Sequence, residues 1–294
     1  MKKNNFLFQT GLTILFSVIC FLTIFPFLLL LSTAFTSEHD LMEYGFRIIP
    51  KNISLDAFKF VFKDPKVVFR AYGVTGSFST VVMILGTFLM ALIAYPLSRK
   101  EFMYRKSIGF YIYFTMLFGG GLVPTFILIT QYLKLSDNLL VYILPNLISP
   151  WYVFLLRSFF QELPDSIFES VRIDGGGEWR VFFQFVLPLS KPAIASVMLF
   201  TLLISWNDWQ TSLLYINNDN LISLQYLLQK IMTEAESILN MSDMGMGSMV
   251  DVSKLPAETG KMAMAVVVAG PALVIFPFFQ KYFVTGLTVG GVKG

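Results

Sequence analysis

Two chemically reactive side chains are nearly absent from this sequence. Its 294 residues include one cysteine, Cys20, and one histidine, His39. A single cysteine excludes an intrachain disulfide, and a single histidine excludes a multi-histidine metal site. The same scarcity argues against a membrane-embedded enzyme, which would need acids, histidines or nucleophiles converging on one site. We therefore expect no catalytic residue and no metal in this chain.

Charged residues are also scarce. They make up 14% of the chain, whereas about 25% is usual for a soluble domain. Hydrophobic residues make up 55%, and the mean hydropathy is +0.66. This apolar surplus exceeds what one soluble core can bury, so the expected surroundings are a lipid bilayer. The net charge of +3 is small and spread along the chain, which argues against a nucleic-acid partner.

Long apolar stretches predict membrane-spanning helices. A span needs about 20 predominantly apolar residues. Six stretches meet this description: Leu12–Phe35, Gly73–Leu97, Ile108–Tyr132, Leu139–Leu156, Leu189–Trp206 and Met262–Phe279. The first stretch is longer than the core of a signal peptide, which has about 7–15 residues, so we interpret it as an uncleaved helix. The sequence predicts an all-α membrane protein with about six spans.

The distribution of positive charge predicts how the spans are oriented. Lys and Arg concentrate in the short connection Arg99–Lys106, and short loops rich in these residues face the cytoplasm. Both termini are then cytoplasmic, and two long loops, 36–72 and 210–261, lie outside. Along the chain we expect an N-terminal segment at 1–11, a single transmembrane domain at 12–284 and a C-terminal tail at 285–294.

A polar segment at 163–188 separates the fourth and fifth spans. Pro164 suits a first helical turn, and Ser166 with Glu169 has the spacing of a capping box. These features predict a helix over about Pro164–Asp174. The glycines at 175–177 would stop this helix and permit a sharp reversal of the chain.

A second helix is predicted to begin near Glu178. Its apolar residues recur at helical spacing and form one face: Trp179, Phe182, Phe183 and Val186. The whole segment is thus a helix, a glycine turn and an amphipathic helix, and two interpretations fit it equally well. The segment is either an interfacial linker lying on lipid headgroups or a docking knob for a soluble partner.

The segment resembles the cytoplasmic signature loop of ABC importer permeases. The family pattern is Glu-Ala-Ala, three residues, Gly, and later an apolar residue with Leu-Pro. This chain reads Glu169-Ser170-Val171, Arg172-Ile173-Asp174, Gly175 and then Val186-Leu187-Pro188. Ser170 and Val171 stand in place of the two alanines. The stretches Leu187–Pro192 and Phe276–Phe283 are similar to the carbohydrate branch, in particular to the shorter permease of maltose-type systems.

This resemblance implies a division of labour between subunits. The signature loop would be a coupling helix seated in a cytoplasmic ABC ATPase dimer, beside a second, different permease. An extracytoplasmic solute-binding protein would deliver a sugar or oligosaccharide across a bacterial cytoplasmic membrane. ATP and Mg²⁺ would be bound by the ATPase, and no cofactor by this chain. The absence of a Gly-x-x-x-x-Gly-Lys-Ser/Thr loop agrees with that expectation.

The resemblance also implies roles for individual residues. The expected ATPase-coupling residues are Glu169, Ser170, Val171, Arg172, Asp174 and Gly175. In the C-terminal tail, Lys293 and Gly294 are expected to form a further ATPase contact.

A sugar path needs hydrogen-bonding groups and aromatic faces. Four residues within or at the ends of spans fit this requirement: Asn146, Trp206, Asn207 and Asp208. Trp206 also occupies a typical position of an interfacial anchor. Asn146 marks either a broken helix beside a cavity or a packing kink.

Other features leave alternatives open. The glycines at 119–121 are interpreted as close helix packing rather than a hinge. The methionines at 241, 244, 246 and 249 are expected to contact the binding protein rather than copper. A secondary transporter is the main alternative function, but such proteins often show internal repeats and charged residues at the midplane of the membrane. We find no convincing repeat, and the spans are nearly free of ionisable groups.

Overall fold

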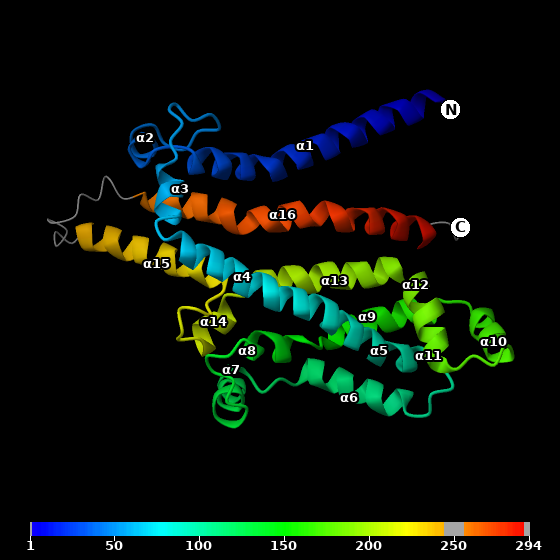
Figure 1. Cartoon of the computed structure of the whole chain (residues 1–294). Coiled ribbons are helices and arrows are strands. Elements are labelled where there is room, and N and C mark those ends of the chain that lie inside the picture. Colours follow the sequence, from blue (N-terminus) through cyan, green and yellow to red (C-terminus); the bar gives the residue numbers. More distant parts are fainter. Residues whose placement is uncertain (1, 244–255, 291–294) are drawn as a thin grey trace. The chain divides into compact units, whose positions relative to one another are not determined.

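The computed structural model describes residues 2–243 and 256–290, and every regular element in these residues is a helix (Figure 1). The prediction of an all-α membrane protein is confirmed. The chain divides into two compact units. The first comprises Met1–Val68 and Leu227–Gly270, and the second comprises Phe69–Tyr226 and Pro271–Gly294.

A buried carboxylate joins two helices of the first unit. Its helices are α1 (Lys2–Ala34), α2 (Glu38–Tyr44), α3 (Asp56–Val61) and parts of α4 (Pro65–Val81), α15 (Leu224–Asp243) and α16 (Ala257–Gly290). Glu38 is 7% exposed. Its carboxylate accepts hydrogen bonds from the backbone N–H of Glu258 (3.0 Å) and of Thr259 (2.9 Å), and from Thr259 Oγ1 (2.7 Å). These bonds satisfy donors that the first turn of α16 leaves free, and they tie α2 to that turn.

The second unit contains the rest of the helices. After α4 come η1 (Val82–Gly86), α5 (Thr87–Ser98), α6 (Arg105–Leu117), α7 (Leu122–Ile127), η2 (Leu128–Tyr132), α8 (Leu140–Ile143), η3 (Leu144–Asn146) and α9 (Pro150–Gln161). They are followed by α10 (Asp165–Ile173), α11 (Glu178–Val181), η4 (Phe182–Val186), α12 (Leu187–Leu189), α13 (Lys191–Trp206) and α14 (Gln210–Tyr215). In Figure 1, α10 and α11 lie at one end of this unit, and α7, α8 and α14 lie at the other.

The core of the second unit forms where α5 packs against α9. Small residues on α5, Ala91 and Ala94, let the two backbones approach. Gly86 serves the same purpose, because a Cβ there would lie 2.9 Å from the carbonyl oxygen of Leu147. Buried side chains of α10, α11, η4 and α13 join the cluster: Phe168, Val171, Val181, Phe182, Val186, Ala193 and Val197. The polar segment at 163–188 is therefore anchored to the spans by its own apolar residues.

Three of the predicted spans coincide with long apolar helices. These are Phe8–Ala34, Pro65–Ser98 and Ala257–Gln280. The second begins at Pro65 rather than Gly73, because proline suits a first helical turn and a more polar stretch precedes the apolar one. The two long loops contain the short helices α2, α3 and α14 and the longer helix α15.

Two of the other predicted spans, Ile108–Tyr132 and Leu139–Leu156, coincide with bent pairs of helices, whereas Leu189–Trp206 covers only the second helix of a third pair, Glu178–Leu189 with Lys191–Trp206. The bends are 109° between α6 and α7, 46° between η3 and α9, and 78° between α12 and α13. By length and composition the chain therefore has three spanning helices, or up to six if each bent pair is one span. Helix α9 continues beyond Leu156, the end of the fourth predicted span, to Gln161.

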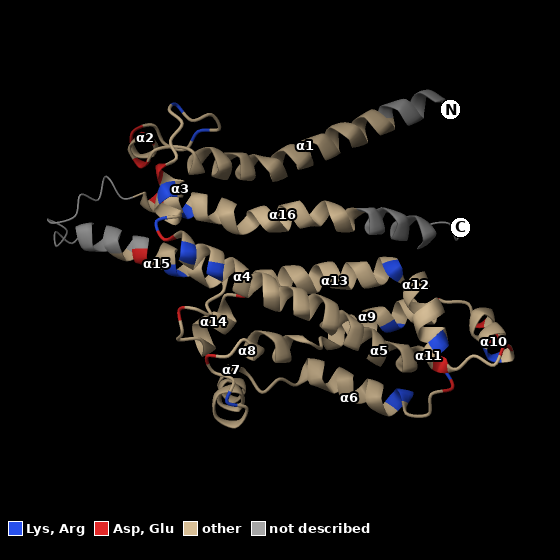
Figure 2. Ribbon diagram, in the orientation of Figure 1, with Lys and Arg blue, Asp and Glu red and all other residues tan. Residues whose placement is uncertain are grey.

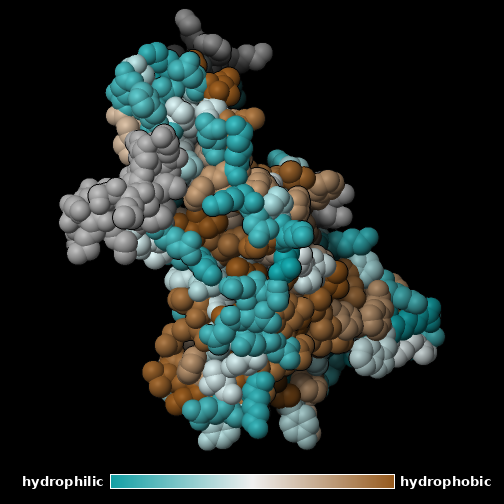
Figure 3. All heavy atoms as spheres, turned by 60° about the vertical axis from the view of Figure 1, so that its left-hand side comes forward, coloured by the Kyte–Doolittle hydropathy of each residue, from teal (hydrophilic) through white to brown (hydrophobic). Residues whose placement is uncertain are grey.

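The surface is that of a protein surrounded by apolar material. Most side chains of α1 from Phe8 to Leu31 are exposed although they are apolar. Hydrophobic residues cover much of the face shown in Figure 3. Lys, Arg, Asp and Glu gather instead at helix ends and in connections (Figure 2). This pattern agrees with helices whose middles contact lipid.

Candidate functional site

The first candidate site is the segment at 163–188, which is a helix, a tight turn and a second helix. Helix α10 ends in a Schellman motif. The N–H of Gly176 donates to the carbonyl of Val171 (2.8 Å), and the N–H of Gly175 donates to that of Arg172 (3.0 Å). Gly175 has φ +74°, a conformation that other residues rarely adopt. The predicted turn-forming role of Gly175 is confirmed.

Gly176 is required for a different reason. A Cβ at this position would lie 2.5 Å from Val171 Cγ1 and 2.9 Å from the Val171 carbonyl oxygen. A Cβ on Gly177 would have no neighbour within 4 Å. The turn therefore presses directly on the buried face of α10.

The predicted capping box of α10 is wrong. Pro164 occupies the N-cap position, and no side chain caps the helix. Ser166 and Glu169 lie inside α10, since the helix already begins at Asp165. The apolar face predicted for the second helix is only half buried. Phe182 and Val186 join the core, whereas Trp179 and Phe183 are 65% and 48% exposed.

Arginines attach α10 to the end of α5. The guanidinium of Arg99 lies 3.4 Å from the ring centroid of Phe168, and its Nη2 lies 3.5 Å from Asp165 Oδ1. Arg172 Nη2 donates to Glu101 Oε2 (2.9 Å) and to Glu178 Oε1 (3.0 Å). The hydroxyl of Tyr95, on α5, donates to the second oxygen of Glu178 (2.5 Å). A continuous series of hydrogen bonds and ion pairs therefore links α5, α10 and α11.

These ion pairs shift the pKa of their members in the expected directions. Hydrogen bonds to Glu101 and Glu178 raise the pKa of the Arg172 guanidinium. The hydrogen bond from Arg172 lowers the pKa of Glu101. The Arg172 and Glu101 side chains are 43% and 60% exposed, and pairs this exposed stabilise a fold by at most about 1 kcal/mol. These ion pairs therefore set the orientation of α10 but contribute little to the stability of the fold.

The outer face of α10 is open. Glu169, Ser170 and Asp174 are exposed, and Ile173 is 85% exposed. Val171 points the other way and is buried. Among the coupling residues expected from sequence, Val171 and Gly175 therefore shape the segment, Arg172 ties it to Glu101 and Glu178, and the exposed three form its free surface.

The second candidate site is a cavity at the opposite end of the second unit. Its volume is about 670 Å³, and it lies between the break before α7, η3, and the junction of α13 with α14. Asn146, Asn207 and Asp208 all line it, as do Trp209 and Tyr215. The break after η3 therefore stands beside a cavity. The described residues that line this cavity include no Lys or Arg.

Trp206 lies outside this cavity. It is 7% exposed, and its ring packs against that of Tyr72 with the centroids 6.3 Å apart. The structure thus brings together three of the four residues expected on a sugar path. Trp209, which is 39% exposed, supplies an aromatic face to the cavity.

Buried hydroxyl groups support the wall of the cavity. The Tyr142 hydroxyl lies 2.5 Å from Ser212 Oγ and donates to the Leu221 carbonyl (2.9 Å). Ser212 Oγ donates to Ser223 Oγ (3.0 Å), which in turn donates to the Asp208 carbonyl (2.8 Å). The sequence gives no local signal for this network, because its members lie far apart along the chain.

The glycines at 119–121 do not mediate close helix packing, and that interpretation is wrong. All three are exposed in the break between α6 and α7, and Gly121 has φ +83°. They border the cavity and let the chain turn there.

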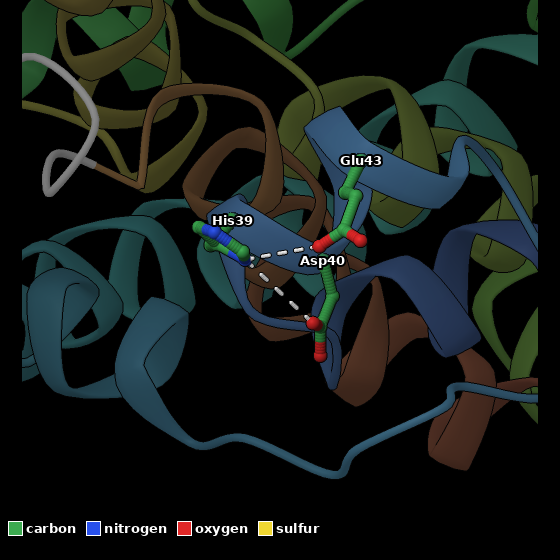
Figure 4. Close-up of side chains that lie close together, drawn as sticks. All are labelled: His39, Asp40 and Glu43. Carbon is green, nitrogen blue, oxygen red and sulfur yellow. Dashed lines mark ion pairs between the residues drawn. The ribbon is translucent and has the colours of Figure 1, made fainter.

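The single histidine lies on a short helix rather than in a loop. His39 Nδ1 is 3.7 Å from Glu43 Oε2 and 3.9 Å from Asp40 Oδ1 (Figure 4). His39 is 77% exposed, so these contacts are those of a solvated helix face. Lys293, Gly294 and Met244, Met246 and Met249 lie outside the described residues.

Comparison with known proteins gives a consistent result. No family model matches the sequence. The chain is 36% identical over 285 residues to the polygalacturonan/rhamnogalacturonan transport system permease protein YtcP of Bacillus subtilis (strain 168), covering 97% of this chain and 96% of that protein. The chain belongs to the family of carbohydrate ABC transporter permeases.

Other similarities of this permease point the same way. It is 30% identical to the arabinooligosaccharides transport system permease protein AraQ of the same organism, over 98% of this chain and 96% of that one. Its structure matches a chain of a bacterial ABC transporter involved in the import of the acidic polysaccharide alginate, with a TM-score of 0.80, 25% identity, and coverage of 95% and 98%. The chain is therefore a transport subunit and not an enzyme.

Proposed function

We propose that this permease subunit carries a sugar or oligosaccharide across the cytoplasmic membrane, driven by ATP hydrolysis on separate ATPase subunits. An extracytoplasmic binding protein delivers the substrate, and a second permease completes the pathway. ATP and Mg²⁺ reside on the ATPase, not on this chain. Both termini and α10 face the cytoplasm, in accord with the basic connection between α5 and α6.

One observation supports this proposal most strongly. The second unit has an exposed surface on α10 that could bind a partner at one end and a polar cavity at the other. Helix α10 is fixed to the core through Phe168 and Val171 while Glu169 and Ile173 stay exposed. A push on α10 would pass through this core into α5 and α9. The cavity residues Asn146 and Asn207 donate through Nδ2 to the carbonyls of Tyr142 (3.0 Å) and Leu203 (2.8 Å), and their Oδ1 atoms are acceptors of the kind that bind sugar hydroxyls.

Charge reversal on α10 tests the coupling role. Glu169→Lys, on the exposed face, is expected to leave membrane insertion intact and to reduce sugar uptake at least about tenfold relative to ATP hydrolysis, because the surface that meets the ATPase changes sign. Uptake and hydrolysis are measured together on the purified transporter in proteoliposomes. Glu162→Lys, an equal charge change on an exposed residue before α10, serves as the control. Normal coupled uptake by the Glu169→Lys variant would refute the coupling role of α10.

A further inference from the structure

A basic groove lies between the start of α6 and the end of α9, apart from both sites described above. Its volume is about 800 Å³. Four cationic side chains line it, and no Asp or Glu does: Lys100, Arg105, Lys106 and Arg157. Its remaining walls are largely aromatic or apolar and are formed by Phe102, Met103, Gly109, Phe110, Tyr113 and Phe154. A cationic rim and an apolar floor thus occur in one groove.

Arg157 is the most enclosed cation of this groove. Its guanidinium reaches from α9 to α6, where a Cβ on the buried Gly109 would lie 3.9 Å from Nη1. It also lies 5.7 Å from the ring centroid of Phe154. Its Nε is buried and has no hydrogen-bond partner. A buried donor of a charged group is costly unless an acceptor meets it.

The four cations of the groove differ from the neighbouring arginines Arg99 and Arg172, because no carboxylate of the described residues lies within ion-pair distance of them. Arg99 and Arg172 each have a carboxylate partner. Within the part of the chain that the structure describes, no ion pair involves any of the four groove cations. Lys100 and Arg105 also border a neighbouring hollow that contains Glu101 and Asp165, but neither carboxylate lines the groove itself. Four cations without an ion pair, one of them with a buried Nε, form a site complementary to a phosphate-bearing anion.

The surroundings of the groove favour a lipid over a soluble anion. Exposed apolar side chains continue from the groove along α6: Phe110 (68% exposed), Tyr113 (50%), Phe114 (45%) and Leu117 (59%). A headgroup phosphate in the groove would let acyl chains lie on this apolar face. Basic residues at the cytoplasmic end of a span are the usual neighbours of anionic headgroups.

We propose that this groove binds the headgroup of an anionic phospholipid, with Arg157 and Arg105 on the phosphate and Lys100 and Lys106 at the rim. Arg157 supplies the enclosed donor, and Arg105 stands opposite it at the first turn of α6. The proposal requires that the chain is embedded in a membrane with the start of α6 at the cytoplasmic face, as proposed above. It holds whichever sugar the transporter carries.

Lipid binding is measured on the transporter purified from its native membranes in mild detergent. Phosphatidylglycerol and phosphatidylcholine are added in turn, and bound lipid is counted by native mass spectrometry. The wild-type protein is expected to retain phosphatidylglycerol in preference. The double variant Arg105→Gln/Arg157→Gln is expected to bind it about 30-fold more weakly, because two cations near the headgroup are lost. Arg180→Gln, at an exposed arginine whose Nε donates to Gln184, is the matched control and should bind normally.

A second readout separates lipid binding from folding. Phosphatidylglycerol should raise the thermal unfolding temperature of the wild type and of Arg157→Lys in nanodiscs, but not that of the double variant. In phosphatidylcholine alone the double variant should be as stable as the wild type, since it removes an unpaired buried donor. Equal binding of both lipids by the wild type would overturn the proposal. The proposal would also be overturned if inorganic phosphate raised the unfolding temperature as much as phosphatidylglycerol does. The same holds if the double variant lost the ATPase subunit while its lipid binding stayed unchanged.

Discussion

Two runs of three consecutive glycines interrupt the second unit, and they build different structures. The run at 175–177 closes a tight Schellman turn that presses on Val171 of α10. The run at 119–121 is exposed in an open break beside the cavity, and Cβ atoms on Gly119 and Gly121 would meet nothing within 4 Å. Both runs turn the chain, but only the run at 175–177 packs against a helix, α10. The same glycine triplet thus forms a packed turn at one end of the second unit and an open break at the other.

The largest effect that tests this comparison is expected at Gly176. Gly176→Ser places a Cβ against Val171, and overpacking of this kind costs about 1–3 kcal/mol. We expect a lower thermal unfolding temperature and weaker coupling of ATP hydrolysis to uptake. The same substitution at Gly177 adds a Cβ in open space at an N-cap position that serine favours. Equal losses from the two variants would show that the turn is not tightly packed.

Gly175 provides the next largest effect. Gly175→Ala forces a side chain into the left-handed region, at a cost of about 1–2 kcal/mol. Asparagine tolerates this region better, so Gly175→Asn should recover part of the lost stability. Thermal unfolding of the purified transporter measures both variants. Alanine performing as well as asparagine would mean that the φ of +74° is not required.

The cavity end is expected to depend on hydrogen bonds rather than on a packed turn. Asp208 Oδ1 accepts from the N–H of Thr211 in the first turn of α14 (3.0 Å). Asp208→Ala loses this bond and about 1 kcal/mol, whereas Asp208→Asn keeps an acceptor and most of the stability. Both variants should weaken sugar uptake if the carboxylate contacts substrate. Unchanged uptake by Asp208→Asn would remove the carboxylate from the pathway.

The smallest effect is expected in the open glycine run. Gly119→Ala should change the free energy of unfolding by no more than about 0.5 kcal/mol, since the new Cβ has no neighbour. The measurement is again thermal unfolding. A loss as large as that of Gly176→Ser would erase the contrast between the two runs.

Local signals in the sequence predicted part of this architecture. Gly175 was predictable because a glycine run directly after a helical segment is typical of a helix C-terminus. Long spans such as Phe8–Ala34 were predictable from hydropathy alone. The motif around Glu169 predicted the family, which the relatives confirm.

Features that depend on tertiary contacts were not predictable. Hydropathy carries no direction, so the apolar stretch Ile108–Tyr132 does not reveal the 109° bend between α6 and α7. Trp206 has the sequence position of an interfacial anchor, yet its packing against Tyr72 buries it. Tyr142 and Glu38 make hydrogen bonds to residues far along the chain, and no local pattern marks them.

We propose that this chain forms a sugar pathway together with a second permease and is powered by a separate ATPase. Affinity purification of the tagged chain from its native membranes in mild detergent, with mass spectrometry of the proteins that accompany it, tests this claim most directly. We expect an ABC ATPase and a second, different permease in the purified complex. A folded chain that purifies alone as a homo-oligomer and still transports sugar would contradict it.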